Sequence, residues 1–322
     1  MFAHLASGLR AALKHPKLVA LLWGGYLLLA LVPALPGLNW LRGAMDFSPA
    51  AGTALQRFDF GLAGELSNYD HSNVFGLLTM TLLGGVLVAL LSSAFAMGGT
   101  LEVLGGEGEA RPFMHRFFRG GGHFFWRFVR LTIIAAVCLV IVVGVVSVGV
   151  GAATTPLADS EWEPAGYLAG FARMIVAVLV GALFLLALDY ARIRVARDGG
   201  RSMFKAYVRA LGFVLRRLLT AYGIAIPIVV MLAALMVCYL AYETNAPAAS
   251  TWGAIATLFL IQQAVVLGRV FLRVSLVGAE RQYDLTMRPT PAPAAAFVPA
   301  VEGSTSAAEQ PPLSADSASP QG

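Results

Sequence analysis

Six apolar runs of about 20 residues, separated by polar turns, constrain this chain more than any other feature of its sequence. Inside a bilayer each backbone amide must be bonded within its own segment, so such runs form helices. About 20 helical residues, at about 1.5 Å each, cross a hydrocarbon core of about 30 Å. We therefore expect an all-α polytopic membrane protein with six transmembrane helices, at Leu18–Leu38, Val74–Gly98, Phe128–Val150, Gly170–Tyr190, Leu218–Tyr242 and Thr251–Leu272.

The composition agrees with a bilayer as the solvent. The chain is 58% hydrophobic and 13% charged, whereas soluble domains average about 45–50% apolar and about 25% charged residues. The basic residues sit beside the apolar runs and not on a free polar face, so nucleic acid is excluded as a partner.

The distribution of positive charge predicts the topology. Of the 23 Lys and Arg residues, 20 fall in the N-terminal segment, the two basic turns and the segment around and after the end of the sixth span. The alternate loops and the outer end of the fourth span hold only Arg42, Arg57 and Arg173. Because cytoplasmic loops carry the excess of Lys and Arg, we expect both termini in the cytoplasm.

The two basic turns resemble each other at an offset of 90 residues, as Arg111–Arg130 and Arg201–Thr220 show. Each combines cations with aromatic or aliphatic residues at helical spacing, which is typical of a helix lying in the membrane interface. We expect amphipathic elbow helices within an internal repeat of about 90 residues. In the first elbow, Gly120–Gly122 would form the bend. The alternative is that basic, aromatic flanks are common to membrane proteins.

The amphipathic segment Met1–Lys17 is a candidate third copy of the elbow, ended by Pro16. The chain would then comprise three units, each an interfacial helix followed by a two-span hairpin. A cleavable signal peptide with Leu18–Ala34 as its apolar region is the competing interpretation. The polar segment Asn39–Ser72 is either a short interfacial helix or an irregular loop.

The composition changes near residue 285. Pro, Ala, Ser and Gln dominate from there, and too little apolar area is present to offset the cost of ordering the chain. We expect a membrane domain over residues 1–284 and a disordered cytoplasmic tail over residues 285–322.

No sequence motif indicates catalysis. The chain lacks HExxH, GxSxG and GxxxxGK[ST] patterns, and its five histidines have no metal-ligand spacing. Cys138 and Cys238 both lie in apolar runs, where they are expected to pack as small hydrophobes. The expectation is a protein that is not an enzyme and uses no cofactor or metal.

Ionisable groups within spans are candidate functional residues. Asp189 lies one turn inside the fourth span, and Arg269 and Arg273 lie at matching depth in the sixth. We predict an intramembrane ion pair of Asp189 with Arg269, or with Arg192. A proton-linked or substrate-linked site is the alternative. Gln262 and Gln263, in the middle of the sixth span, would bond between helices or line a polar cavity.

The stretches Asp189–Arg192 and Arg209–Val214 carry a family resemblance. With its hydropathy layout, the chain resembles uncharacterised bacterial multi-pass proteins that are similar to the membrane domain of some glycerophosphodiester phosphodiesterases. The resemblance implies a six-helix membrane domain with amphipathic elbows in a bacterial inner membrane. It carries over no catalytic residue.

The favoured function is that of a membrane-organising, lipid-interacting or partner subunit, with a protein partner or a second copy as further candidates. Six basic residues are expected to contact anionic lipid headgroups: Arg111, Arg116, Arg119, Arg201, Lys205 and Arg209. A transporter or channel with a polar site near Asp189, Gln262 and Arg269 is the alternative. A lipid-modifying enzyme ranks third.

Overall fold

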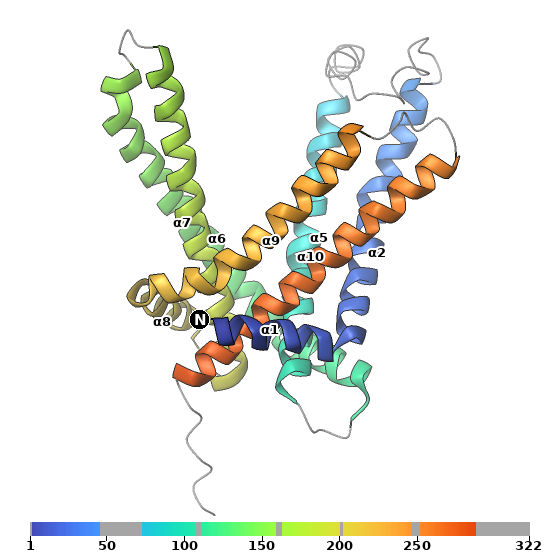
Figure 1. Ribbon diagram of the computed structural model, residues 1–322, viewed down its shortest axis with the longest axis vertical. Coiled ribbons are helices and arrows are strands. Elements are labelled where there is room, and N and C mark those ends of the chain that lie inside the picture. Colours follow the sequence, from blue (N-terminus) through green and yellow to red (C-terminus); the bar gives the residue numbers. More distant parts are fainter. Residues whose placement is uncertain are drawn as a thin grey trace, which may run out of the picture. The chain divides into compact units, whose positions relative to one another are not determined.

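A computed structural model describes residues 2–45, 73–106, 111–158, 163–199, 202–245 and 252–287 (Figure 1). In these ranges every regular element is an α-helix, which confirms the predicted fold class. The helices are α1 (Phe2–Lys14), α2 (Pro16–Met45), α5 (Asn73–Gly105), α6 (Phe113–Ala158), α7 (Glu163–Asp198), α8 (Met203–Arg216), α9 (Leu218–Asn245) and α10 (Trp252–Met287).

Within the described ranges, α5, α6, α7, α9 and α10 are each long and apolar enough to cross a membrane. The bent pair α1–α2, with 77° between its halves, passes the same test when taken as one broken span. The protein is therefore a multi-pass membrane protein. Helix α10 continues to Met287, past the predicted domain boundary at residue 284. The predicted tail beyond residue 287 and the polar segment 46–72 lie outside the described residues.

The buried core lies at one end of the helices. Its residues come from five stretches, 94–104, 117–135, 184–195, 207–228 and 270–284, together with parts of α1 and the start of α2. In the opposite halves of the described spans, only Ala169 is buried. We call the end that holds this core, together with α1, α8 and the first part of α6, the basic end. The opposite halves present apolar side chains outward, as spans do in lipid.

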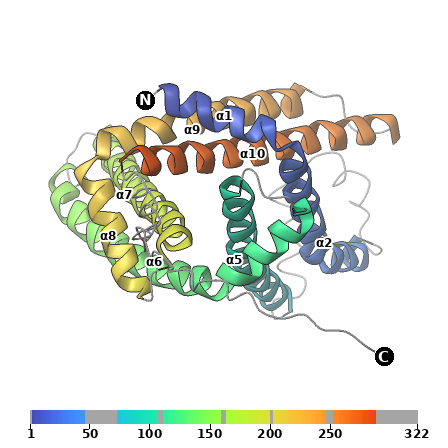
Figure 2. The same ribbon diagram turned by 90° about the horizontal axis from the view of Figure 1, so that it is seen from below.

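At the basic end, each of three surface segments packs on one of the spans (Figures 1 and 2). The start of α6 packs on α5, α8 packs on α7, and α1 packs on α10. The helix faces that make these contacts have their buried residues at the same spacing. Positions three and seven residues after the first buried aromatic residue are also buried, as Phe117, Gly120 and Phe124 in α6, and as Tyr207, Ala210 and Val214 in α8. Gly8 and Ala12 repeat the last two positions in α1.

Tyr207 anchors α8 to α7. Its ring is 1% exposed, and its hydroxyl donates to the carbonyl of Phe184 at 3.4 Å. Burial raises the pKa of Tyr207 above the usual range of tyrosine, so its hydroxyl stays protonated and able to donate. Ser202 caps the start of α8 by accepting a hydrogen bond from the backbone N–H of Lys205.

Glycines allow α5 and α6 to approach closely. A Cβ atom on Gly98 would lie 2.8 Å from the carbonyl oxygen of Gly120, and a Cβ on Gly120 would lie 2.8 Å from that of Gly98. Gly121 faces the ring of Phe95 in the same crossing. Gly120 and Gly121, two of the three glycines at the expected bend, are part of this helix–helix contact, and α6 remains helical through all three. Small residues allow backbones to approach in this way.

Helix α1 makes a second close crossing, with α10. A Cβ atom on Gly8 would lie 2.8 Å from the Cβ of Ala279, and one on Gly278 would lie 3.2 Å from the Cβ of Ala11. The His4 and Tyr283 rings meet edge to face, with centroids 5.5 Å apart. These contacts hold α1 across the basic end of α10.

Candidate functional site

An ion pair joins α7 to α10 at the basic end. Arg273 donates through two nitrogens to the two carboxyl oxygens of Asp189, at 2.7 Å each. Arg192 lies 3.6 Å from the same carboxylate, on the next turn of α7. Asp189 and Arg192 are both 5% exposed. The arginine in α10 is thus Arg273, one turn beyond Arg269.

Arg269 does not join this cluster. It is exposed and makes no ion pair with Asp189 in the described part of the chain. The partner predicted in the sixth span is therefore misplaced by one turn, whereas Arg192, the other candidate, is beside Asp189.

Arg192 also links the ion pair to α6. One of its terminal nitrogens donates to the hydroxyl of Thr132 at 2.8 Å, and this hydroxyl donates to the carbonyl of Phe128 at 2.7 Å. Both side chains belong to the buried core. The cluster therefore ties three spans together with charge-assisted hydrogen bonds, which are stronger than neutral ones.

A second charged cluster lies around Asp284. Its carboxylate accepts from Nε of Arg194 at 3.0 Å and lies 3.5 Å from Arg197. Arg194 also donates to the backbone carbonyl of Arg209 at 3.4 Å, and its guanidinium lies 4.1 Å from the centroid of the Phe213 ring. These contacts join α7, α8 and α10. A guanidinium over an aromatic face is an attractive arrangement.

Glu280 lies between the two clusters along α10. It is completely buried, and neither carboxyl oxygen accepts a hydrogen bond from the described residues. The negative charge of Asp189 repels an ionised Glu280, and the positive charge of Arg273 attracts it. Burying a carboxyl group without donors is unfavourable, so this residue is a point of low stability in the core. Sequence reasoning missed it, although Glu280 lies seven residues after Arg273 and so on the same helix face.

The predicted headgroup contacts fall into two groups. Arg116 donates to the carbonyls of Glu102, at 3.2 Å, and Val103, at 2.8 Å, and Arg119 forms an ion pair with Glu102. Arg116 thus satisfies backbone carbonyls at the end of α5, whereas Arg119 bonds to a side chain of that helix. Arg111, Lys205 and Arg209 are exposed. Arg201 lies outside the described residues.

Large apolar side chains are exposed beside the exposed cations. In α8 they are Phe204, 59% exposed, and Val208, 49% exposed. Met114 and Phe118 occupy the positions 90 residues earlier and are exposed to 51% and 57%. Each helix thus has a buried face, an exposed apolar face and a basic face, as expected for a helix at a membrane surface.

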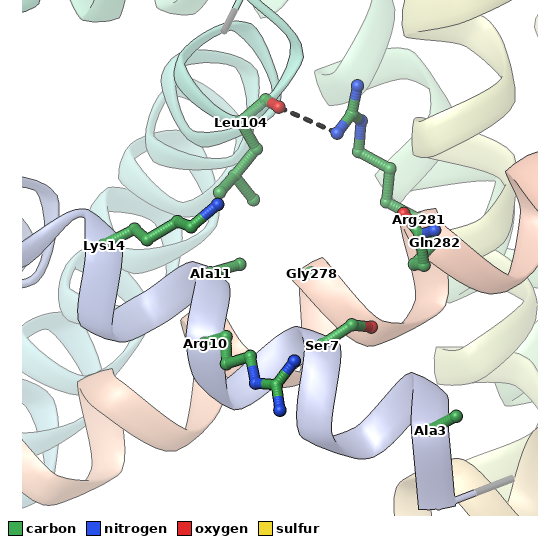
Figure 3. A pocket seen from close by; sticks show the side chains of 9 residues that line it. All are labelled: Ala3, Ser7, Arg10, Ala11, Lys14, Leu104, Gly278, Arg281 and Gln282. Carbon is green, nitrogen blue, oxygen red and sulfur yellow. Dashed lines mark hydrogen bonds between the residues drawn. The ribbon is translucent and has the colours of Figure 1, made fainter.

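A polar cavity of about 330 Å³ lies between α1, α10 and the end of α5 (Figure 3). Among the residues that the structure describes, three cationic side chains and no acidic one line it. The lining consists of Ala3, Ser7, Arg10, Ala11, Lys14, Leu104, Gly278, Arg281 and Gln282.

The described residues show no group of three or more His, Cys, Asp or Glu side chains placed to hold a metal ion. The charged clusters consist of arginines and carboxylates that bond to one another, an arrangement that holds helices together or binds ions and headgroups. Of the mid-span amides, Gln262 is exposed, and Oε1 of Gln263 is buried without a hydrogen-bond partner among the described residues.

Comparison of the chain with protein-family models, with curated proteins and with solved structures gives no match. The functional assignment therefore depends on the geometry of the basic end.

Proposed function

We propose that this protein is a non-enzymatic, lipid-interacting subunit of a bacterial inner membrane, with its basic end at the cytoplasmic surface. In this proposal, the surface helices bind anionic phospholipid headgroups. The protein organises the lipid around it or presents this surface to a partner.

The three-sided character of α8 is the observation that supports the proposal. Tyr207 holds one side on α7, and Phe204 and Val208 are exposed on another. Lys205 and Arg209 lie directly beside these apolar residues and are exposed. In a bilayer, this arrangement places the apolar side chains among the acyl chains and the cations at headgroup level.

The start of α6 supports the same function. Met114 and Phe118 are exposed where α8 has Phe204 and Val208, and the two segments share their buried positions. In this proposal, α8 and the start of α6 are copies of one repeated unit, and α1 is a third copy. Such a repeat surrounds the basic end with interfacial helices.

The test removes charge from the surface while leaving the ion pairs of the core intact. We expect the triple variant Arg111→Gln, Lys205→Gln, Arg209→Gln to co-purify with less anionic phospholipid than the wild type, as quantified by mass spectrometry of extracted lipid. Each cation near an anionic surface contributes about 1 kcal/mol of attraction. The total amount of co-purified lipid should fall by a smaller factor than the anionic share of that lipid.

A charge-preserving control keeps the same positions basic, as Arg111→Lys, Lys205→Arg and Arg209→Lys. This variant should retain the wild-type lipid composition. Unchanged anionic lipid in the glutamine variant would contradict the proposal.

A transport function is the second candidate, because one face of α10 carries a polar stripe. Gln262, Arg269, Arg273 and Glu280 recur at intervals of seven, four and seven residues, which places them within about 40° around the helix axis. The first three are exposed at or next to membrane depth. An exposed arginine in a span is costly in lipid and marks a polar pathway or partner contact.

Thiol labelling separates transport from lipid binding. In a variant with Cys138 and Cys238 replaced by Ala, a membrane-impermeant maleimide should label Gln262→Cys if the stripe faces water. It should leave Leu260→Cys, which is exposed on another face, unlabelled. Protection of both positions would remove the support for a transport pathway.

A further inference from the structure

We propose that the cavity between α1 and α10 is a binding site for a phosphate group. The site is distinct from the surface tested above on α8 and the start of α6, because none of the described residues that line the cavity belongs to either segment. Its ligand is the phosphate of a lipid headgroup or of a soluble phosphate compound.

Charge is the first reason for this assignment. Arg10, Lys14 and Arg281 all line the cavity, and the described residues that line it include no acidic side chain. Figure 3 shows Lys14 and Arg281 extending toward Leu104 from two different helices. A dianionic phosphate carries more negative charge and more acceptor oxygens than a carboxylate. It can therefore bond to several nearby cations at once.

Three described carboxylates of the neighbouring elements are engaged elsewhere or buried. Glu102 pairs with Arg119, and Asp284 pairs with Arg194 and Arg197. Glu280 is completely buried in the core. Arg10 and Lys14 are therefore not neutralised by these three groups.

The walls of the cavity are held firmly. Arg281 donates to the backbone carbonyl of Leu104 at 2.7 Å, which positions its guanidinium at the end of α5. The close crossing at Gly8 and Gly278 fixes α1 against α10. Binding therefore requires little ordering of the backbone, which favours affinity.

The volume also fits a small ligand. A cavity of about 330 Å³ is at the lower end of the range of about 300–1,000 Å³ for ligand pockets. It accommodates a phosphate with a short substituent. Gln282 adds an amide donor at the edge of the cavity, and such donors complete the recognition of phosphate oxygens.

Calorimetric titration of the full chain in maltoside micelles tests the site. The probes are inorganic phosphate and dihexanoyl phosphatidic acid, each at constant ionic strength. We expect saturable binding of at least one probe. The double variant Arg10→Gln, Lys14→Gln should weaken that binding about tenfold or more, because each charge-assisted bond to phosphate is strong.

Two controls distinguish the site from general charge effects. Arg130→Gln with Arg216→Gln removes the same charge from exposed positions that do not line the cavity, and it should change the affinity less than about twofold. Gln282→Glu places a carboxylate in the cavity and should abolish binding. Both Arg10 and Lys14 are exposed, so we expect these variants to fold, which a thermal melt checks.

The two probes identify the source of the phosphate. Saturable binding of phosphatidic acid alone indicates a lipid headgroup, and saturable binding of inorganic phosphate as well indicates a soluble phosphate compound. Absence of saturable binding by both probes would overturn the proposal, as would equal weakening in the cavity variant and in the Arg130→Gln, Arg216→Gln control. The lipid-binding surface on α8 is tested separately by co-purified lipid, so failure of either proposal leaves the other intact.

Discussion

The Asp189–Arg273 contact shows what an intramembrane ion pair contributes in this protein. Asp189 is held on two sides, by Arg273 and by Arg192, so its negative charge is compensated although it is buried. Taking such charges out of water costs free energy. The attraction between the two ions offsets this cost only when their hydrogen-bond geometry is good. The pair therefore specifies how α7 and α10 meet more than it adds net stability.

Two arginines one turn apart provide a matched test of this pair. Arg273→Gln should lower the free energy of unfolding by about 1–2 kcal/mol, because Asp189 loses its bidentate partner. The expected loss is moderate because the Arg273 side chain is 43% exposed. Arg269→Gln should change it by less than about 0.5 kcal/mol. Thermal melts in detergent compare the two, and equal effects would contradict the assignment.

Two buried carboxyl groups in α10 should respond in opposite ways to neutralisation. Glu280→Gln should leave the melting temperature unchanged or raise it, because Glu280 accepts no hydrogen bond within the described residues. Asp284→Asn should lower it, since Arg194 is buried and loses its counter-charge. Thermal melts of both variants at one pH check this contrast. Destabilisation by both substitutions would show that Glu280 has a donor.

At the residue scale, the sequence predicted that Asp189 would pair, because a carboxylate in an apolar span requires a partner. It did not predict the correct residue of α10. Depth along a span is uncertain by about a turn, since it depends on helix tilt. Glu280 and Asp284 were missed because α10 extends beyond the apolar run that defined the sixth span.

At the scale of elements, close crossings position the surface helices. Gly98 and Gly120 bring α5 and α6 together, and Gly8 and Gly278 bring α1 and α10 together. In lipid, association depends on such packing because apolar side chains gain little by leaving the acyl chains. The crossings hold the cations of the surface segments at fixed positions on the basic end.

The run of three glycines in α6 contains its own control. Gly120→Ala should destabilise the protein by about 1–3 kcal/mol, because the new Cβ would meet the Gly98 carbonyl at 2.8 Å. Gly122→Ala has open space around it and should stabilise the helix by up to about 1 kcal/mol. Detergent unfolding curves report both values, and effects of the same sign would refute the crossing.

The sequence predicted the surface segments but not their contacts. Cations and aromatic residues at helical spacing indicated interfacial helices at residues 111–130 and 201–220. A run of glycines is compatible with a bend or with close packing against another helix. Only the position of the neighbouring helix shows that Gly120 and Gly121 make a close contact. Likewise Arg116 and Arg119 were expected to face lipid, although Arg116 bonds to the end of α5 and Arg119 pairs with Glu102.

At the scale of the whole molecule, long apolar runs made the membrane architecture predictable. Five of the six expected spans are found, because length and hydropathy determine which helices can cross a bilayer, and the expected first span passes the same test only as a bent pair with α1. The cavity between α1 and α10 was not predicted, since its cations come from segments about 270 residues apart in sequence. The proposal of a phosphate site therefore depends on side chains that only the fold brings together.

Topology gives a prediction at this scale. With Cys138 and Cys238 replaced by Ala, a membrane-impermeant thiol reagent added to intact bacteria should label Asn245→Cys but not Lys205→Cys. This follows because basic segments stay in the cytoplasm. In inside-out vesicles the labelling should reverse. Labelling of Lys205→Cys in intact cells would contradict a cytoplasmic basic end.

Native mass spectrometry of the protein released from lipid nanodiscs tests the lipid-binding proposal most directly. The nanodiscs contain equal amounts of phosphatidylglycerol and phosphatidylcholine. We predict that wild-type protein retains mainly phosphatidylglycerol, and that Arg111→Gln, Lys205→Gln, Arg209→Gln shifts the retained lipid toward equal amounts. Equal retention of the two lipids by the wild type, unchanged in the variant, would contradict the proposed function.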